Sequence, residues 1–109
     1  MTIGPQITIY THHFGGITKP TKAWLVADLF PDVADIATFA VHRAANTRVY
    51  PWQITNIETG FFVPGTSACS RARAIKAAIA KQHKERTLAA IRNAVEQHNL
   101  HNHPDTPST

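Results

Sequence analysis

The chain has 109 residues, of which 43% are apolar and 17% charged, and its formal net charge is +4. This length suits one domain with a core of its own, and this composition excludes an intrinsically disordered chain. The one cysteine, Cys69, excludes an internal disulfide framework, and no apolar run approaches the roughly 20 residues needed to cross a bilayer. We therefore expect a cytoplasmic protein with a single domain over residues 1–97 and a disordered, His-rich tail over 98–109.

Two strands are predicted near the start of the chain. Residues 5–14, PQITIYTHHF, alternate Ile7 and Ile9 with polar neighbours, which is the pattern of a half-buried strand. The glycines and proline of residues 15–20 then favour a turn. Residues 22–30, KAWLVADLF, form a compact apolar run, and we expect a second strand that ends at the proline that follows.

Residues 31–45 fit two structures. At helical spacing their apolar side chains form one stripe, with a proline and an aspartate suited to the first turn. At strand spacing, Phe39 and Val41 share one face. We favour an irregular lead-in followed by a strand over residues 36–43, because a meander then runs directly into the next hairpin.

A hairpin and a long helical segment complete the pattern. Residues 50–57 and 60–64 predict two short strands, joined where Gly60 can adopt a positive φ. Thr66 or Ser67 then offers an N-cap for a helix.

The helical segment, residues 68–97, changes its apolar face halfway. Its first half places Ala68, Ala72, Ile75 and Ile79 on one stripe, whereas the apolar residues of its second half lie on the other side. Either the helix breaks near KQHKER, with Thr87 capping a second helix, or one long helix buries opposite faces and needs a partner molecule. The second option predicts a homodimer through three residues of the second half: Leu88, Ile91 and Val95.

The positive charge is unevenly distributed along the chain. Residues 1–65 carry four basic and four acidic residues, whereas residues 66–109 carry seven basic and three acidic ones. A neutral body with a basic helix indicates an anionic partner, either nucleic acid or an acidic protein surface. The residues expected to contact it are five cations and two hydroxyl residues near the free amides at the start of the helix: Arg71, Arg73, Lys76, Lys81, Lys84, Ser67 and Ser70.

The large apolar residues supply the predicted core. Its main members are Trp24, Leu25, Val26, Phe39, Val41, Trp52, Ile54, Phe61, Val63, Ile75 and Ile79. Adjacent residues of a strand face opposite sides of a sheet, so Phe62 is the candidate for an exposed aromatic contact when Phe61 is buried.

No catalytic or metal-binding pattern is complete in this sequence. His12 and His13 point apart in a strand, and the tail histidines lie in a segment expected to be disordered. Cys69 has no histidine in a recognisable motif beside it, and we expect a buried structural thiol. We expect no enzyme activity, no metal and no cofactor.

The segment WQITNIETGFFVPG and the small-residue helix after it, Trp52 to Ala80, resemble the hairpin-plus-helix modules of small accessory proteins of phages and plasmids. The resemblance covers about a quarter of the chain and carries no site residue beyond the hairpin. It implies an accessory protein of a mobile genetic element that binds nucleic acid or blocks a host defence complex.

Together these patterns predict an α+β fold: an antiparallel meander of about four or five strands packed on a C-terminal helix or helix pair. The expected function is non-enzymatic nucleic-acid binding through the basic helix. The alternatives are a protein-directed inhibitor of a host defence nucleoprotein complex, of the anti-CRISPR or anti-restriction type, and a structural dimerisation module.

Overall fold

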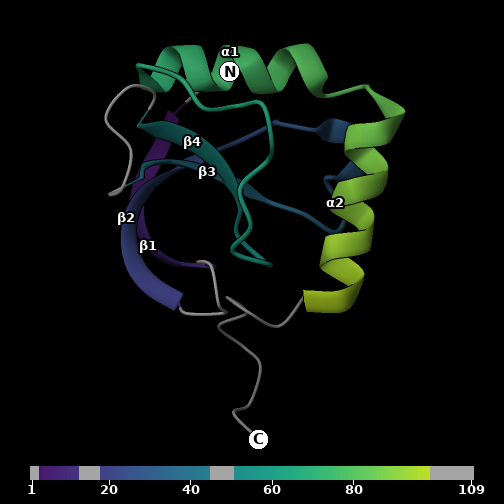
Figure 1. The fold of residues 1–109 in the computed structure, drawn as a ribbon, viewed down its shortest axis with the longest axis horizontal. Coiled ribbons are helices and arrows are strands. Elements are labelled where there is room, and N and C mark those ends of the chain that lie inside the picture. Colours follow the sequence, from purple (N-terminus) through teal and green to yellow (C-terminus); the bar gives the residue numbers. More distant parts are fainter. Residues whose placement is uncertain (1–2, 13–17, 45–50, 99–109) are drawn as a thin grey trace, which may run out of the picture.

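The computed structural model describes residues 3–12, 18–44 and 51–98. Its four strands form an antiparallel sheet in the order β1-β2-β3-β4, and two helices follow (Figure 1). The predicted α+β meander is therefore confirmed. The elements are β1 (Ile3–His12), β2 (Thr18–Val26), the short 3-10 helix η1 (Pro31–Val33), β3 (Phe39–Arg43), β4 (Trp52–Asn56), α1 (Arg71–Lys81) and α2 (Glu85–His98). Of the predicted tail only His98 is described, as the last residue of α2.

β1 and β2 form the longest hairpin of the sheet. The second strand begins earlier than predicted, so Pro20 lies inside β2 opposite Tyr10 rather than in the turn. A proline removes one donor from the ladder and is tolerated where only one neighbouring strand needs pairing. This condition holds at Pro20, because β2 pairs with β3 only from Ala23 onwards.

The ambiguous segment contains a strand, as favoured, and the helical alternative is wrong. Only one turn of 3-10 helix forms at η1, and β3 then pairs on both sides, with Val41 opposite Trp24 of β2 and Ile54 of β4. Two ladders of backbone hydrogen bonds outweigh a weak helical preference. Glu58 anchors the start of β3, because its carboxylate accepts from the Thr38 amide at 2.7 Å and the Thr38 hydroxyl at 2.6 Å.

The second strand of the predicted 50–64 hairpin is reduced to a single bridge between Thr55 and Phe62. Gly60 has the expected positive φ of 75°, and the Val63 amide donates to the Ile54 carbonyl at 2.8 Å. Pro64 has no amide hydrogen and cannot continue the ladder. The chain therefore leaves β4 as a loop, which becomes one wall of the groove described below.

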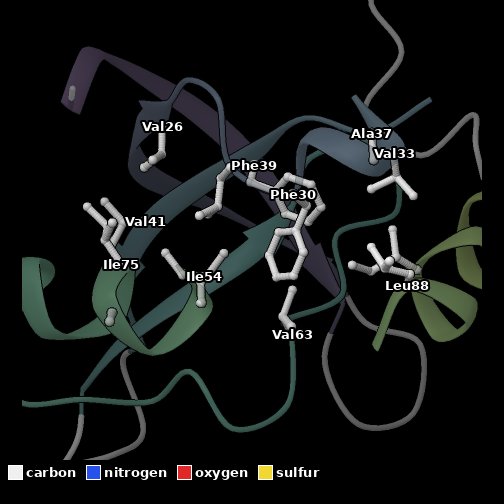
Figure 2. Close-up of a cluster of buried hydrophobic side chains, with 14 of the residues drawn as sticks. Val26, Phe30, Val33, Ala37, Phe39, Val41, Ile54, Val63, Ile75 and Leu88 are labelled. Atoms are coloured by element: carbon white, nitrogen blue, oxygen red, sulfur yellow. The ribbon is translucent and has the colours of Figure 1, made fainter. Parts of the chain in front are cut away.

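Helix α1 packs on β3 and β4, helix α2 packs on η1, and the two helices enclose the main core on one side of the sheet (Figures 1 and 2). Six predicted core residues are buried: Val26, Phe39, Val41, Ile54, Val63 and Ile75. Trp24, Leu25 and Trp52 are half-buried, and the prediction is wrong for Phe61 and Ile79, which are exposed. Phe30 was not part of the predicted core, but it is buried against Phe39 with ring centroids 4.8 Å apart.

Helix α1 is rotated relative to its predicted orientation. It buries Ala74, Ile75 and Ala78, whereas Ala72 is exposed. The alanines have no side chain beyond Cβ, so the helix can pack closely against β3 and β4 along that line. The apolar stripe of the sequence identified the helix, but the small residues determined which side faces the sheet.

Because α1 is rotated, replacing each of two isoleucines one turn apart should lower the free energy of unfolding by different amounts. Ile75 is 8% exposed and Ile79 is 39% exposed. We expect Ile75→Ala to lower the free energy of unfolding by about 2–5 kcal/mol, because it leaves a cavity in the core. Ile79→Ala should cost less than about 1 kcal/mol. Urea denaturation of both variants measures the difference, and equal losses would contradict this orientation of α1.

The helical segment breaks, and its second half packs on the same domain. The Lys84 amide donates to the Lys81 carbonyl, and α2 then begins at Glu85, with the Leu88 amide donating to the Lys84 carbonyl. Thr87 is therefore inside the helix and not its cap. The three residues expected to form a dimer contact are buried in the chain's own core: Leu88, Ile91 and Val95. The change of apolar face reflects a corner between two helices, so these residues offer no surface to a second copy.

The other face of the sheet carries a second buried cluster, formed by Ile9, Ala23 and Ala40. Buried beside them, His42 Nε2 lies 2.5 Å from the Thr55 hydroxyl. Within the described residues, neither helix has the length and apolar character that a membrane span requires.

Candidate functional site

The start of α1 differs from the expected anion site. Ala68 is not helical: it pairs with Trp52, and its amide donates to the Trp52 carbonyl at 2.8 Å. The N-cap is Ser70, whose hydroxyl accepts from the Arg73 amide at 3.2 Å. Thr66, a predicted cap, is instead buried and donates its hydroxyl to the Val63 carbonyl at 2.7 Å.

Substituting the two serines should therefore change the free energy of unfolding by different amounts. Ser70→Ala removes the side-chain cap of α1 and should lower the free energy of unfolding by about 1 kcal/mol. Ser67 is exposed and lies before the cap, so Ser67→Ala should change it by less than about 0.5 kcal/mol. Thermal denaturation of both variants measures these changes. A larger loss of stability for Ser67→Ala would show that Ser67, and not Ser70, caps α1.

Arg71 has a fixed position at the first residue of α1. Its guanidinium carbon lies 4.9 Å from the ring centroid of Trp24 and 5.6 Å from that of Trp52. The two indoles are themselves in contact, with centroids 5.9 Å apart. A guanidinium stacked on an aromatic face keeps its N–H groups available at the edge for hydrogen bonds to a phosphate or carboxylate.

The other predicted cations do not share one face of α1. Arg73 and Lys76 are exposed on its outer side, away from the buried Ile75. Lys81 is half-buried and lies against the loop after β4, because a Cβ added at Gly65 would come within 2.5 Å of its Cε. Lys84 is exposed in the connection between the helices. The basic residues therefore run along α1 and round its corner with α2.

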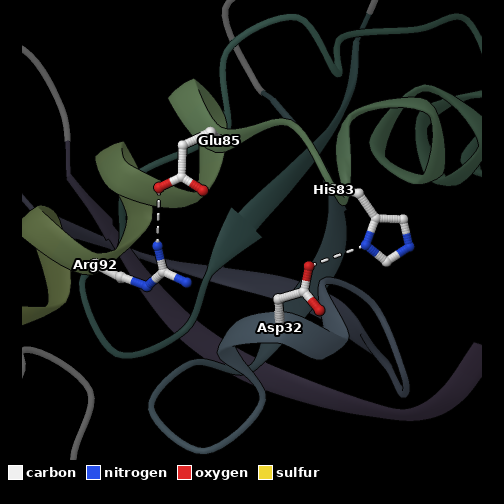
Figure 3. A network of polar contacts seen from close by, with 4 residues as sticks. All are labelled: Asp32, His83, Glu85 and Arg92. Atoms are coloured by element: carbon white, nitrogen blue, oxygen red, sulfur yellow. Dashed lines mark hydrogen bonds and ion pairs between the residues drawn. The ribbon is translucent and has the colours of Figure 1, made fainter.

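Among the described residues, most of these cations form no ion pair with a carboxylate. The sequence has no Asp or Glu between Glu58 and Glu85. In the part of the chain that the structure describes, the ion pairs are His83 with Asp32 at 3.0 Å and Arg92 with Glu85 at 3.4 Å (Figure 3). Six cations of the C-terminal segment are thus without a carboxylate partner there: Arg71, Arg73, Lys76, Lys81, Lys84 and Arg86.

An open groove of about 570 Å³ lies between the loop after β4 and α2. Phe61 and Phe62 of the loop are exposed, as expected for Phe62 but not for Phe61. The groove is lined by Asn56, Thr59, Phe61, Phe62, Val63, Pro64, Lys81, Arg86, Thr87, Ala90, Ile91 and Ala94. Most of this lining is apolar, no carboxylate is part of it, and its two charged side chains, Lys81 and Arg86, are both cations.

Neither the groove nor the place of Arg86 in its lining was predicted from the sequence. The two walls come from residues 59–64 and 86–94, which are distant along the chain. The adjacent phenylalanines before Pro64 were the available signal, because both cannot be buried on one side of a strand.

The described residues contain no group of three or more His, Cys, Asp or Glu side chains that could hold a metal ion. The expectation of a buried Cys69 is wrong, because this thiol is exposed. The histidines at positions 13, 101 and 103 lie outside the described residues.

The chain matches no protein-family model, no curated protein and no solved structure.

Proposed function

We propose that this protein is a small, non-enzymatic nucleic-acid-binding protein that contacts phosphates along α1 and round the corner between α1 and α2. The observation that carries this proposal is the run of cations between Glu58 and Arg86 without carboxylate partners among the described residues. Unneutralised cations are the electrostatic requirement for binding a polyanion.

The placement of the cations suits phosphate contacts rather than base readout. Arg73 and Lys76 are three residues apart on the exposed side of α1, so they are neighbours on the helix surface. Contacts from lysine and arginine to phosphates need no shaped pocket and carry no sequence information. We therefore expect binding with little preference for base sequence.

We place this protein in the cytoplasm of a host cell, as a product of a mobile genetic element. The resemblance of Trp52 to Ala80 to accessory proteins of phages and plasmids suggests a mobile genetic element, and a single exposed thiol suits a reducing cytoplasm.

The groove favours a second candidate function, inhibition of a host defence nucleoprotein complex by protein contact. Exposed apolar residues such as Phe61 and Phe62 also occur at protein interfaces. Such an inhibitor would bind free nucleic acid weakly, because its affinity would come from the protein component.

A titration separates the two functions. Labelled single- and double-stranded DNA and RNA are mixed with the protein at low and at moderate salt, and fluorescence anisotropy reports binding. For phosphate contacts we expect saturable binding. The logarithm of the binding constant should fall linearly with the logarithm of the salt concentration. Absence of binding at low salt would refute nucleic acid as the partner and leave the inhibitor function.

A further inference from the structure

We propose that the groove between the loop after β4 and α2 holds an unpaired base of a single-stranded nucleic acid, with phosphates of the same strand on Lys81 and Arg86. This inference rests on the proposed function and makes it more specific, because it names the form of nucleic acid and the place where a base is bound.

The aromatic wall is the first reason. Phe62 is 49% exposed, Phe61 is 36% exposed, and both line the groove. A nucleobase stacks on an aromatic side chain whatever its identity, because every base has a flat π face. An exposed aromatic ring such as that of Phe62, on a surface that also carries cations, is the combination found in single-strand binding sites.

The remaining lining favours a flat, uncharged ring. Val63 and Ile91 are buried at the groove, and Ala90 and Ala94 of α2 contribute only methyl groups. A volume of about 570 Å³ lies within the range of small-molecule sites. An apolar groove of this size accommodates a base but offers no stabilisation to a charged group lying along it.

Asn56, which carries the one side-chain amide of the lining, is not available to select a particular base. The Asn56 side chain is already engaged, since it donates to the Thr38 carbonyl at 3.1 Å and to the Glu58 carboxylate at 3.0 Å. Its carbonyl accepts from the Thr59 amide at 3.0 Å. It therefore cannot read the edge of a base without breaking these contacts.

The charges at the rim select the occupant. Lys81 comes from the end of α1 and Arg86 from the first turn of α2, and no carboxylate lines the groove. A phosphodiester strand carries a negative charge at each nucleotide, so a strand with one base in the groove could continue along the cations of α1, from Lys81 to Lys76 and Arg73. An acidic peptide would match these cations, but its carboxylate side chains supply no flat, uncharged ring for the apolar lining.

Only an unpaired base can enter the groove. In a duplex each base is covered above and below by its neighbours and paired at its edge, so removing it from the stack costs a few kcal/mol. The protein should therefore prefer single strands, whereas phosphate contacts alone would allow equal or tighter binding of a duplex.

The test compares short oligothymidylate, oligouridylate and a DNA duplex of equal length by fluorescence anisotropy. We expect the protein to bind single strands more tightly than the duplex, and the two single-stranded arms show whether the strand is DNA or RNA. Phe62→Ala should weaken single-strand binding by about 5- to 20-fold and leave duplex binding unchanged. The double variant Lys81→Gln, Arg86→Gln should also weaken it.

Matched controls exist for both changes. Tyr10 on β1 has the same exposed fraction as Phe62, 49%, and lies on the strand farthest from β4, so Tyr10→Ala should have no effect. Arg92 lies on α2 outside the groove lining, and Arg92→Gln should be close to wild type. Equal binding of single strand and duplex, unchanged by Phe62→Ala, would overturn the base site and leave the proposed function intact. Failure of every oligonucleotide to bind would overturn both.

Crosslinking of the unaltered protein avoids any folding defect in the variants. A 5-iodouracil oligonucleotide is irradiated in the complex, and the crosslinked peptide is identified by mass spectrometry. We expect the crosslink on the segment that contains Phe61 and Phe62. Crosslinks confined to α1 would show that no base enters the groove.

Discussion

The double variant Arg73→Glu, Lys76→Glu is expected to lose nucleic-acid binding by at least about tenfold at low salt. Both side chains are exposed on the outer side of α1 and lack a carboxylate partner among the described residues. Reversing them replaces two attractive phosphate contacts with two repulsive ones. The slope of log affinity against log salt should also decrease, by about 1 for each contact removed. Anisotropy titrations over a range of salt concentrations measure both quantities.

A control variant tests whether a change of net charge by itself causes the loss of nucleic-acid binding. Arg73→Glu and Arg92→Glu alter the net charge equally, and each changes an exposed arginine of a helix. Arg92 is paired with Glu85 on α2, so its reversal should weaken binding only slightly. Equal weakening by the two single variants would indicate a diffuse charge effect and contradict a binding surface on α1.

The variant Leu88→Asp is expected to unfold the protein, or at least to lower its free energy of unfolding by about 4 kcal/mol or more. Leu88 is 3% exposed and belongs to the main core, where it lies next to Val33 of η1 (Figure 2). The substitution removes a buried apolar side chain and places a carboxylate where no cation pairs with it. Small domains have about 5–15 kcal/mol of total stability, so a loss of this size removes much of it.

The neighbouring residue supplies the control. Ala89 is exposed on α2, so Ala89→Asp adds the same charge one residue away without entering the core. Its effect should stay within about 0.5 kcal/mol. Circular dichroism with urea measures stability, and sedimentation measures mass. A Leu88→Asp protein that stays folded and changes only from dimer to monomer would contradict the burial of Leu88 and restore the dimer hypothesis.

The strands were predictable because their signals are local. Alternation of Ile7 and Ile9 requires only the period of a strand, and the positive φ of Gly60 requires only a residue without a Cβ. The strand at β3 was favoured correctly over a helix, although its own residues fit both. The decisive contribution came from pairing with β2 and β4, which a continuous meander makes available without long connections.

The arrangement of the two helices could not be predicted from local sequence periodicity. The periodicity of residues 68–97 indicated two apolar faces, which fits a broken helix and a dimerising helix equally well. The choice depends on whether α2 can fold back to place Leu88 against the core, and this depends on the volume left by Val33 and Phe30. The contribution of small residues to the packed side of α1 likewise depends on the sheet beneath it.

The order of the charged residues along the chain already places the excess positive charge in the C-terminal segment, because this order does not depend on folding. Strand period and turn residues, which act over a few positions, predicted most of the strands as well. Only the tertiary structure decided where each cation points: Arg71 onto two indoles, Lys81 across Gly65 into the groove, and Arg73 to the outside. These directions, and the groove itself, arise from packing between segments distant in the chain, and no local periodicity encodes the shape left between them.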